Sequence, residues 1–275
     1  MFKKTKSMAR LALVAAAALC VFAPTVSAQS VADSPTLRSL GNYREVSKAP
    51  GESLSLVRRT VISEAARVLG GQAGRRDRTI ELRKQLDDLE SALDKQYEFG
   101  QFVLPGGFLP PVIIRSSDLM TVGENYIRMG ADRFEIYKGA SPAPQNPSWR
   151  QWMYIGLSIS EPPSLEYVRG GTPKNREEQA FFDRELAAAY KEGRDAADRT
   201  LSVNYAELEK VYSGMRNFYE LLARGMVTAP KIRTRASIVT AEGRQAIVTG
   251  DTYFEVVTDT NFVMDAGAWK PLGVR

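Results

Sequence analysis

The sequence predicts an α+β fold in which amphipathic helices, one of them long, pack with antiparallel β-meanders. Apolar residues recur every three or four positions over residues 53–98 and again over residues 175–227, a period typical of amphipathic helices. Short β-branched and aromatic segments, separated by glycine turns, lie between these two stretches and after Pro230. Helices and strands therefore occupy separate parts of the chain, as in α+β proteins.

Residues 1–28 have the features of a secretory signal peptide. Four basic residues lie within the first ten positions, and the apolar run Leu11–Phe22 follows them. Small residues at Val26-Ser27-Ala28 predict cleavage before Gln29. The apolar run is shorter than the roughly 20 residues that a bilayer-spanning helix needs. We therefore expect cleavage and export rather than retention as a membrane anchor.

Cys20 is the only cysteine, and it lies inside this apolar run. A disulfide within the cleaved chain is therefore excluded. Lipid attachment at Cys20 is the alternative, but a lipidated cysteine follows a small residue and Leu19 is large. We expect Cys20 to be removed with the signal peptide.

The charge of the cleaved chain does not favour nucleic-acid binding. The sequence has 37 lysines and arginines, and removing the four in the signal peptide leaves 33 against 32 acids. Nucleic-acid-binding domains carry a concentrated basic surface. No direct binding to DNA or RNA is expected.

Residues 29–51 mix serine, proline, glycine and charge without a period, which predicts an extended, mobile N-terminal arm before an α+β domain over residues 52–275. The domain begins with a predicted helical pair over residues 53–98. Its first helix ends at Gly70-Gly71, and its second begins near Asp77. A short glycine-containing connection favours antiparallel pairing of the two helices.

Residues 99–173 are predicted to form short strands and proline-rich loops. Turn-forming glycines at Gly123-Glu124-Asn125 and Gly130-Ala131-Asp132 divide an expected meander that begins at Val112–Ile114. Six prolines keep residues 139–173 irregular but stiff.

The long helix is predicted near residues 175–227, where no proline interrupts the pattern. About 50 residues of unbroken helix would measure roughly 75 Å. Either a kink near Gly193 or Gly214 divides the helix, or it projects from the domain. Strands follow over residues 231–260, with turns expected at Glu242-Gly243 and Gly250-Asp251.

The chain contains no histidine, which excludes Ser-His-Asp and Cys-His catalysis and the usual zinc sites. A G-x-x-x-x-G-K-[ST] phosphate loop is also missing from the sequence. Paired acids remain as candidates for glycoside hydrolysis. They lie in two clusters, Asp87, Asp88 and Glu90, and Glu177 and Glu178. Both clusters fall among basic residues on predicted helices, which favours solvated helix faces. No catalytic, metal-binding or cofactor-binding residue is predicted, and no cofactor is expected.

Aromatic residues in a proline-framed loop are the other candidates for function. The candidate residues are Pro147, Trp149, Arg150 and Trp152. Tryptophan and arginine are enriched at binding hot spots, but buried tryptophans also fasten loops to a core. Both a partner interface and loop stapling are therefore open for these residues.

Four segments of the chain, in order, resemble the DotC family of type IVB secretion systems, which includes the TraI proteins of IncI-type conjugative plasmids. The segments are Phe99–Val112, Asn146–Arg150, Pro173–Gln179 and Tyr212–Pro230. The resemblance implies a non-enzymatic structural subunit of the outer-membrane core complex, in a ring-forming assembly with DotD-like and DotH-like partners. An alternative hypothesis is a periplasmic cell-wall glycan hydrolase that assists assembly of the apparatus.

One departure from the family pattern concerns the membrane. Members of that family are generally lipoproteins, whereas Leu19-Cys20 is a poor lipid-attachment signal and Val26-Ser27-Ala28 is a good ordinary cleavage site. We therefore expect the chain to be exported to the periplasm and to reach the outer membrane through its partners.

Overall fold

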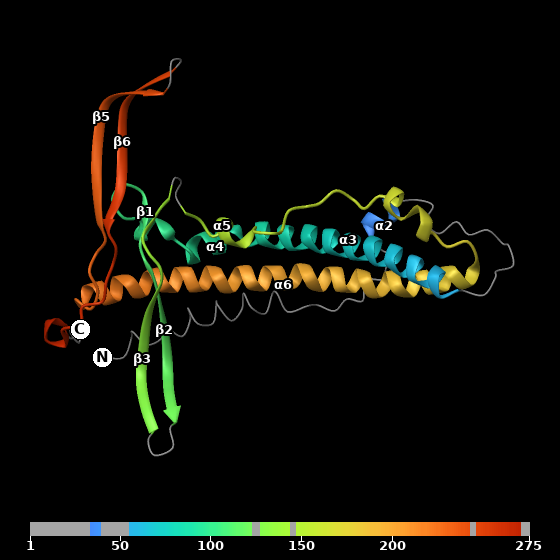
Figure 1. The fold of residues 1–275 in the computed structure, drawn as a ribbon, viewed down its shortest axis with the longest axis horizontal. Coiled ribbons are helices and arrows are strands. Elements are labelled where there is room, and N and C mark those ends of the chain that lie inside the picture. The colour runs from blue at the N-terminus through green and yellow to red at the C-terminus, as the bar shows by residue number, and fades with distance from the viewer. Residues whose placement is uncertain (1–33, 40–54, 123–126, 144–146, 243–245, 271–275) are drawn as a thin grey trace. The chain divides into compact units, whose positions relative to one another are not determined.

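The computed structural model describes residues 34–39, 55–122, 127–143, 147–242 and 246–270 (Figure 1). The chain divides into two compact units. One consists of Met1–Asp77 with Glu161–Gly193, and the other of Arg78–Ser160 with Arg194–Arg275. Two long helices, α3 (Leu56–Asp88) and α6 (Arg176–Ala223), contribute residues to both units.

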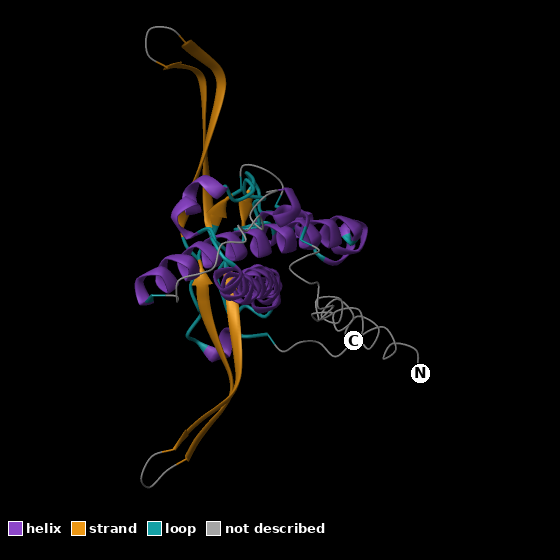
Figure 2. Cartoon of the chain, turned by 90° about the vertical axis from the view of Figure 1, so that its right-hand side faces the viewer, coloured by secondary structure: helices purple, strands orange, loops and turns teal. Residues whose placement is uncertain are grey.

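The architecture is α+β, which confirms the predicted fold class. Among the described residues, strands pair only in antiparallel two-stranded sheets, and Figure 2 shows the long ones as separate hairpins. The long strands are β2 (Val112–Val122), β3 (Ile127–Lys138), β5 (Lys231–Glu242) and β6 (Ala246–Thr258). The short elements are α2 (Pro35–Ser39), α4 (Glu90–Gln96), α5 (Arg150–Met153), β1 (Phe108–Leu109), β4 (Ser141–Pro142) and the 3-10 helices Phe99–Phe102, Leu165–Gly171 and Ala266–Ala268.

The predicted stop at Gly70-Gly71 is wrong, because α3 runs without a break from Leu56 to Asp88. Asp77 lies inside this helix and does not begin a second one. In the first unit, a Cβ atom on Gly70 would lie 2.5 Å from the backbone oxygen of Leu186 in α6. Glycine in a helix interior costs about 1 kcal/mol relative to alanine. Here the missing side chain allows close packing between the helices, which offsets that cost.

The core of the first unit combines side chains from α2, α3, the 3-10 helix after residue 164 and α6. Its buried members are Leu37, Ile62, Ala65, Ala66, Leu69, Ala73, Val168, Phe182, Leu186 and Tyr190. Leu37 is only 1% exposed. Part of the predicted mobile arm is therefore helix α2, packed into the core through an apolar side chain. The rest of that arm, the predicted signal peptide and Cys20 lie outside the described residues.

In the second unit, long two-stranded hairpins are found where meanders of shorter strands were predicted. The expected turn at Gly130-Ala131-Asp132 is wrong, since these residues lie within β3 and Gly130 pairs with Leu119 of β2. The expected turn at Gly250-Asp251 is wrong for the same reason, because Asp251 pairs with Ser237 of β5. Cross-strand pairing thus overrides the local turn preference of glycine and aspartate.

Helix α6 is one uninterrupted element of 48 residues. Buried side chains recur along its length, from Phe182 to Leu221. Gly193 and Gly214 lie inside the helix and do not divide it. In the second unit, a Cβ atom on Gly214 would lie 2.4 Å from the Val112 side chain. The glycine therefore makes room for β2, and the C-terminal part of α6 packs with β2–β3 around Ile113, Phe218 and Leu221.

Candidate functional site

The proline-framed loop places Trp149 in the interior of the second unit. Pro147 is buried and Trp149 is 1% exposed. The indole Nε1–H of Trp149 donates a hydrogen bond to Asp94 Oδ1 at 2.7 Å. Asp94 belongs to α4, so this bond joins the loop to a helix 55 residues earlier in the chain. A buried indole N–H needs such a partner.

Arg150 lies beside this contact and reinforces it. Its guanidinium carbon is 4.4 Å from the centre of the Trp149 ring, and Nη1 donates to Asp94 Oδ1 at 2.8 Å. Nη2 also donates to Glu90 of α4. Hydrogen bonds from Arg150 and then from Trp149 lower the pKa of Asp94. Arg150 therefore contacts the face of the Trp149 ring and also donates a hydrogen bond to Asp94, the carboxylate that accepts from the indole.

Trp152 lies at the edge of a second contact region. Its ring stacks on Phe99 with centroids 4.8 Å apart and an angle of 9° between the planes. Phe99 also meets Tyr212 of α6 edge to face, as do Tyr97 and Phe102. Offset stacked and edge-to-face pairs each add about 0.5–1.5 kcal/mol beyond area burial. Trp149 and Trp152 thus attach the same loop to two different places.

The far end of the loop is held by Asn204, a buried residue of α6. Its Nδ2 donates to the backbone oxygens of Met153 at 3.1 Å and Ile155 at 2.6 Å. Sequence analysis did not single out Asn204, Asp94 or Phe99. Phe99 carried one signal, since it begins the first segment that resembles the DotC family. Asp94 and Asn204 carried none, because polar residues on helices are common on solvated faces.

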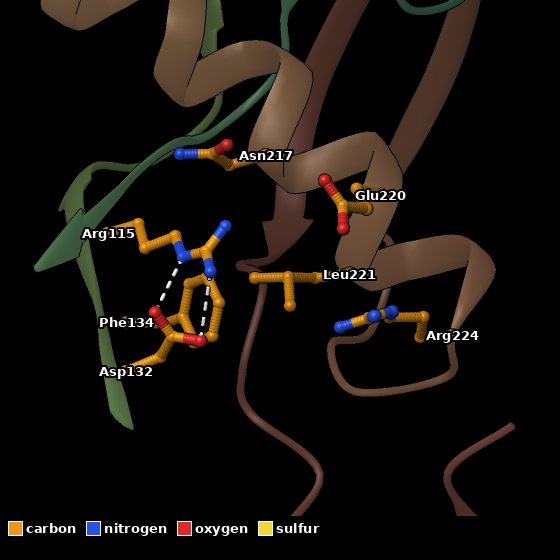
Figure 3. Close-up of a pocket in the computed structure, with 7 residues that line it drawn as sticks. All are labelled: Arg115, Asp132, Phe134, Asn217, Glu220, Leu221 and Arg224. Atoms are coloured by element: carbon orange, nitrogen blue, oxygen red, sulfur yellow. Dashed lines mark hydrogen bonds and ion pairs between the residues drawn. The ribbon is translucent and has the colours of Figure 1, made fainter. Parts of the chain in front are cut away.

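A small polar pocket lies between β2–β3 and the C-terminal part of α6 (Figure 3). It is lined by Arg115, Asp132, Phe134, Asn217, Glu220, Leu221 and Arg224. Arg115 donates to both carboxylate oxygens of Asp132, at 2.7 and 3.0 Å, and this lowers the pKa of Asp132. The pocket holds about 100 Å³. Small-molecule sites measure roughly 300–1,000 Å³, so this pocket is too small for a sugar chain.

Three of the five acids in the clusters that were candidates for glycoside hydrolysis form internal contacts. Asp87 accepts a hydrogen bond from the Tyr154 hydroxyl at 2.7 Å, and Glu90 pairs with Arg150. Glu178 pairs with Arg58 at 2.8 Å, and the hydrogen bond from Arg58 lowers its pKa. Asp88 and Glu177 are exposed.

Within the described part of the chain, no group of three or more His, Cys, Asp or Glu side chains is placed to hold a metal ion. No helix in this part is long and apolar enough to cross a membrane.

Comparison with known families decides the class of protein. A family model described as "Type IV secretory system, conjugal DNA-protein transfer" matches residues 56–271. The chain belongs to this TraI family of type IV secretory systems. The match confirms the resemblance seen in the four sequence segments and extends it through the C-terminal hairpin β5–β6. No curated protein matches the chain.

Proposed function

We propose that this TraI-family chain is a non-enzymatic structural subunit of the outer-membrane core complex of a type IVB secretion or conjugation system. The observation that carries the proposal is the family match over residues 56–271, which includes both hairpins and both long helices. In this role the chain helps to assemble the channel at the outer membrane. Its partners are DotD-like and DotH-like subunits in a ring-forming assembly.

The contacts of the charged residues support a structural role. Hydrogen bonds fasten the Trp149 loop to α4, and Arg58 fastens the start of α3 to Glu178 at the start of α6. A glycosidase needs a general acid whose pKa is raised. Among the described acids whose pKa is shifted, the shift is downward. These acids are Glu81, Asp94, Asp132, Glu178 and Glu207. They stay ionised at neutral pH, which suits ion pairs better than acid catalysis.

The place of action in this proposal is the periplasmic side of the outer membrane. The signal-like residues 1–28 support export, and the poor lipid-attachment signal at Leu19-Cys20 supports attachment through proteins.

A deletion experiment tests the proposal. Donor cells without the gene are expected to lose transfer, to regain it with a plasmid copy, and to keep their cell-wall hydrolase profile unchanged. The purified mature chain, expected to begin at Gln29, is also incubated with peptidoglycan. Release of muropeptides that stops when an exposed acid such as Glu177 is changed to Gln would reject the structural role in favour of the hydrolase. Transfer at the parental level in the deletion strain would reject a function in the apparatus altogether.

A further inference from the structure

The hairpin β5–β6 leaves large apolar side chains partly exposed, although the Phe254 ring lies against the turn at Gly106. None of the described side chains in β5 or β6 is buried. Tyr253 is 57% exposed, Val257 46% and Phe254 38%. The hydrophobic core around Phe218 contains no residue of either strand. An isolated two-stranded hairpin is marginally stable in water, so this hairpin needs a packing partner outside its own described contacts.

The outer edges of the hairpin are also open. β5 and β6 pair along their whole length from Lys231↔Thr258 to Glu242↔Ala246. Among the described residues no third strand is hydrogen-bonded to either of them, so they form a two-stranded sheet (Figure 1). Each outer edge therefore presents a row of backbone N–H and C=O groups to which another strand can bind.

The two edges carry opposite charges. β5 contains Lys231, Arg233 and Arg235 against the single acid Glu242, whereas β6 contains Asp251 and Glu255 and no base. Four of these side chains are placed in the structure, and they form no hydrogen bond or ion pair with another described residue. They are Lys231, Arg233, Arg235 and Glu255. Arg233 and Glu255 are direct cross-strand partners in the register, so opposite charges already face each other within the hairpin, and a neighbouring copy would continue this alternation.

The other hairpin lacks this pattern. Strand β2 has one base and one acid, Arg115 and Asp118, and β3 mixes both signs along its length. Phe134 and Ile136 of β3 pack against the hydrophobic core, and Lys138 pairs with Glu207 of α6 at 2.9 Å. β2–β3 therefore contributes side chains to the core of its own unit, whereas the described side chains of β5–β6 do not.

We propose that the hairpins β5–β6 of neighbouring copies of this chain pair edge to edge, with the basic β5 of one copy against the acidic β6 of the next. The two strands of each hairpin are antiparallel. Copies related by rotation about an axis along the strands keep alternating strand directions, so β5 meets β6 of the next copy as an antiparallel neighbour. Two different edges join at each contact, and such a contact repeats around a ring. The inference rests on the proposed function, which requires many copies in one assembly.

Charge reversal in donor cells tests the pairing. Two differently tagged full-length copies are expressed together with the rest of the apparatus. One copy is captured by its tag, and the amount of the other copy that copurifies with it is measured. One variant, Arg233→Glu with Arg235→Glu, has two acidic edges. The second, Asp251→Lys with Glu255→Lys, has two basic edges. Each variant alone is expected to reduce capture between copies by roughly tenfold, because like charges on adjacent strands repel.

Mixing the two variants separates pairing between copies from damage within a hairpin. Each variant keeps like charges inside its own hairpin, but an acidic edge now meets a basic edge of the neighbouring copy. Capture between the two variants is therefore expected to return close to the parental level. The control exchanges an exposed ion pair on the other hairpin, Arg133→Glu with Glu135→Arg, and should leave capture unchanged.

Three results would overturn the inference. These are parental capture with either variant alone, failure of the mixture to recover, and no capture between parental copies. The proposed function is judged separately, by loss of transfer in the deletion strain. If the deletion strain transfers normally, the proposed function is rejected even when copies are captured together. If the deletion strain loses transfer but capture does not depend on these charges, the pairing alone is rejected.

Discussion

A Cβ atom on Gly74 would lie 2.0 Å from the backbone carbonyl oxygen of Tyr190. The two helices of the first unit therefore touch backbone to backbone at this point. One turn further along α3, the Tyr190 hydroxyl donates to Asp77 Oδ2 at 3.0 Å. The glycines of α3 thus set the distance at which this hydrogen bond forms.

Gly74→Ala should destabilise the chain by about 1–3 kcal/mol, since the added methyl group forces the two backbones apart. Gly71→Ala is the matched control, because a Cβ atom on Gly71 would lie 4.0 Å from the Ala189 oxygen, an ordinary contact distance. There alanine should be neutral or stabilising by up to about 1 kcal/mol, as expected inside a helix. Urea unfolding of both full-length variants measures the difference. Equal effects at the two positions would contradict the close contact.

The ion pair between Arg58 and Glu178 should make the stability of the fold decrease at acidic pH. Arg58 Nε and Nη2 donate to the two carboxylate oxygens at 3.0 and 2.8 Å, and the Glu178 side chain is 8% exposed. Arg58 lowers the pKa of Glu178 below its ordinary value of 4.5. The stabilisation is therefore present above pH 4.5 and is lost as pH falls from there through the lowered pKa.

Glu178→Gln should lower the free energy of unfolding at pH 7. Below pH 4.5, the free energy of unfolding of this variant should decrease less with falling pH than that of the parent. Thermal melts at a series of pH values measure this. Glu135→Gln serves as the control, because its ion pair with Arg133 is exposed at both ends and such pairs contribute about 0–1 kcal/mol. An unchanged acid profile in Glu178→Gln would show that the pair does not carry the effect.

Trp149→Ala should cost about 3–5 kcal/mol, the range for removing a buried large aromatic side chain. Trp149→Phe keeps most of the apolar contact but leaves Asp94 without the indole donor, and should cost less. Trp269→Ala is the control, since that ring is 40% exposed. Melting temperature and yield in the assembled complex are both measured. A Trp149→Ala variant that melts like the parent and assembles normally would exclude both loop stapling and a partner contact.

Helix α2 should be released when its core contact is lost. Leu37 is 1% exposed, and the hydroxyls of Ser34 and Thr36 both donate to Asp77. Leu37→Ala should make α2 much more sensitive to limited proteolysis, because its only core side chain is shortened. Exposed Pro35, changed to Ala, is the control. Equal cleavage rates in the two variants would mean that Leu37 does not hold the segment.

The exported chain should begin at Gln29 and incorporate no labelled fatty acid. Expressed alone, it should fractionate with periplasmic material, and with its core-complex partners it should move to the outer membrane. Without a lipid it lacks the roughly 0.8 kcal/mol per buried CH₂ that an acyl chain supplies. Leu19→Ala, which places a small residue before Cys20, is the matched variant expected to gain label. Acylated Cys20 at the N-terminus of the parental chain would reject attachment through partners alone.

The candidate loop shows how far sequence analysis reached. Proline framing and aromatic content singled out Trp149, Arg150 and Trp152, because these are local properties of the sequence. Their partners Asp94 and Phe99 lie about 50 residues earlier. No local pattern distinguishes Asp94 from other acids on a helix face, so the hydrogen bond could not be predicted.

The sequence by itself determined the family, the fold class and the position of the long helix. It did so because apolar periodicity and family motifs are properties of consecutive residues. Only the tertiary structure decided that α3 passes through Gly70-Gly71, since the close approach of α6 offsets the cost of glycine in a helix. Pairing between strands likewise placed Gly130 and Gly250 inside β3 and β6 instead of at turns. The same structure left the described side chains of β5–β6 without burial, because burial depends on what the rest of the chain can reach.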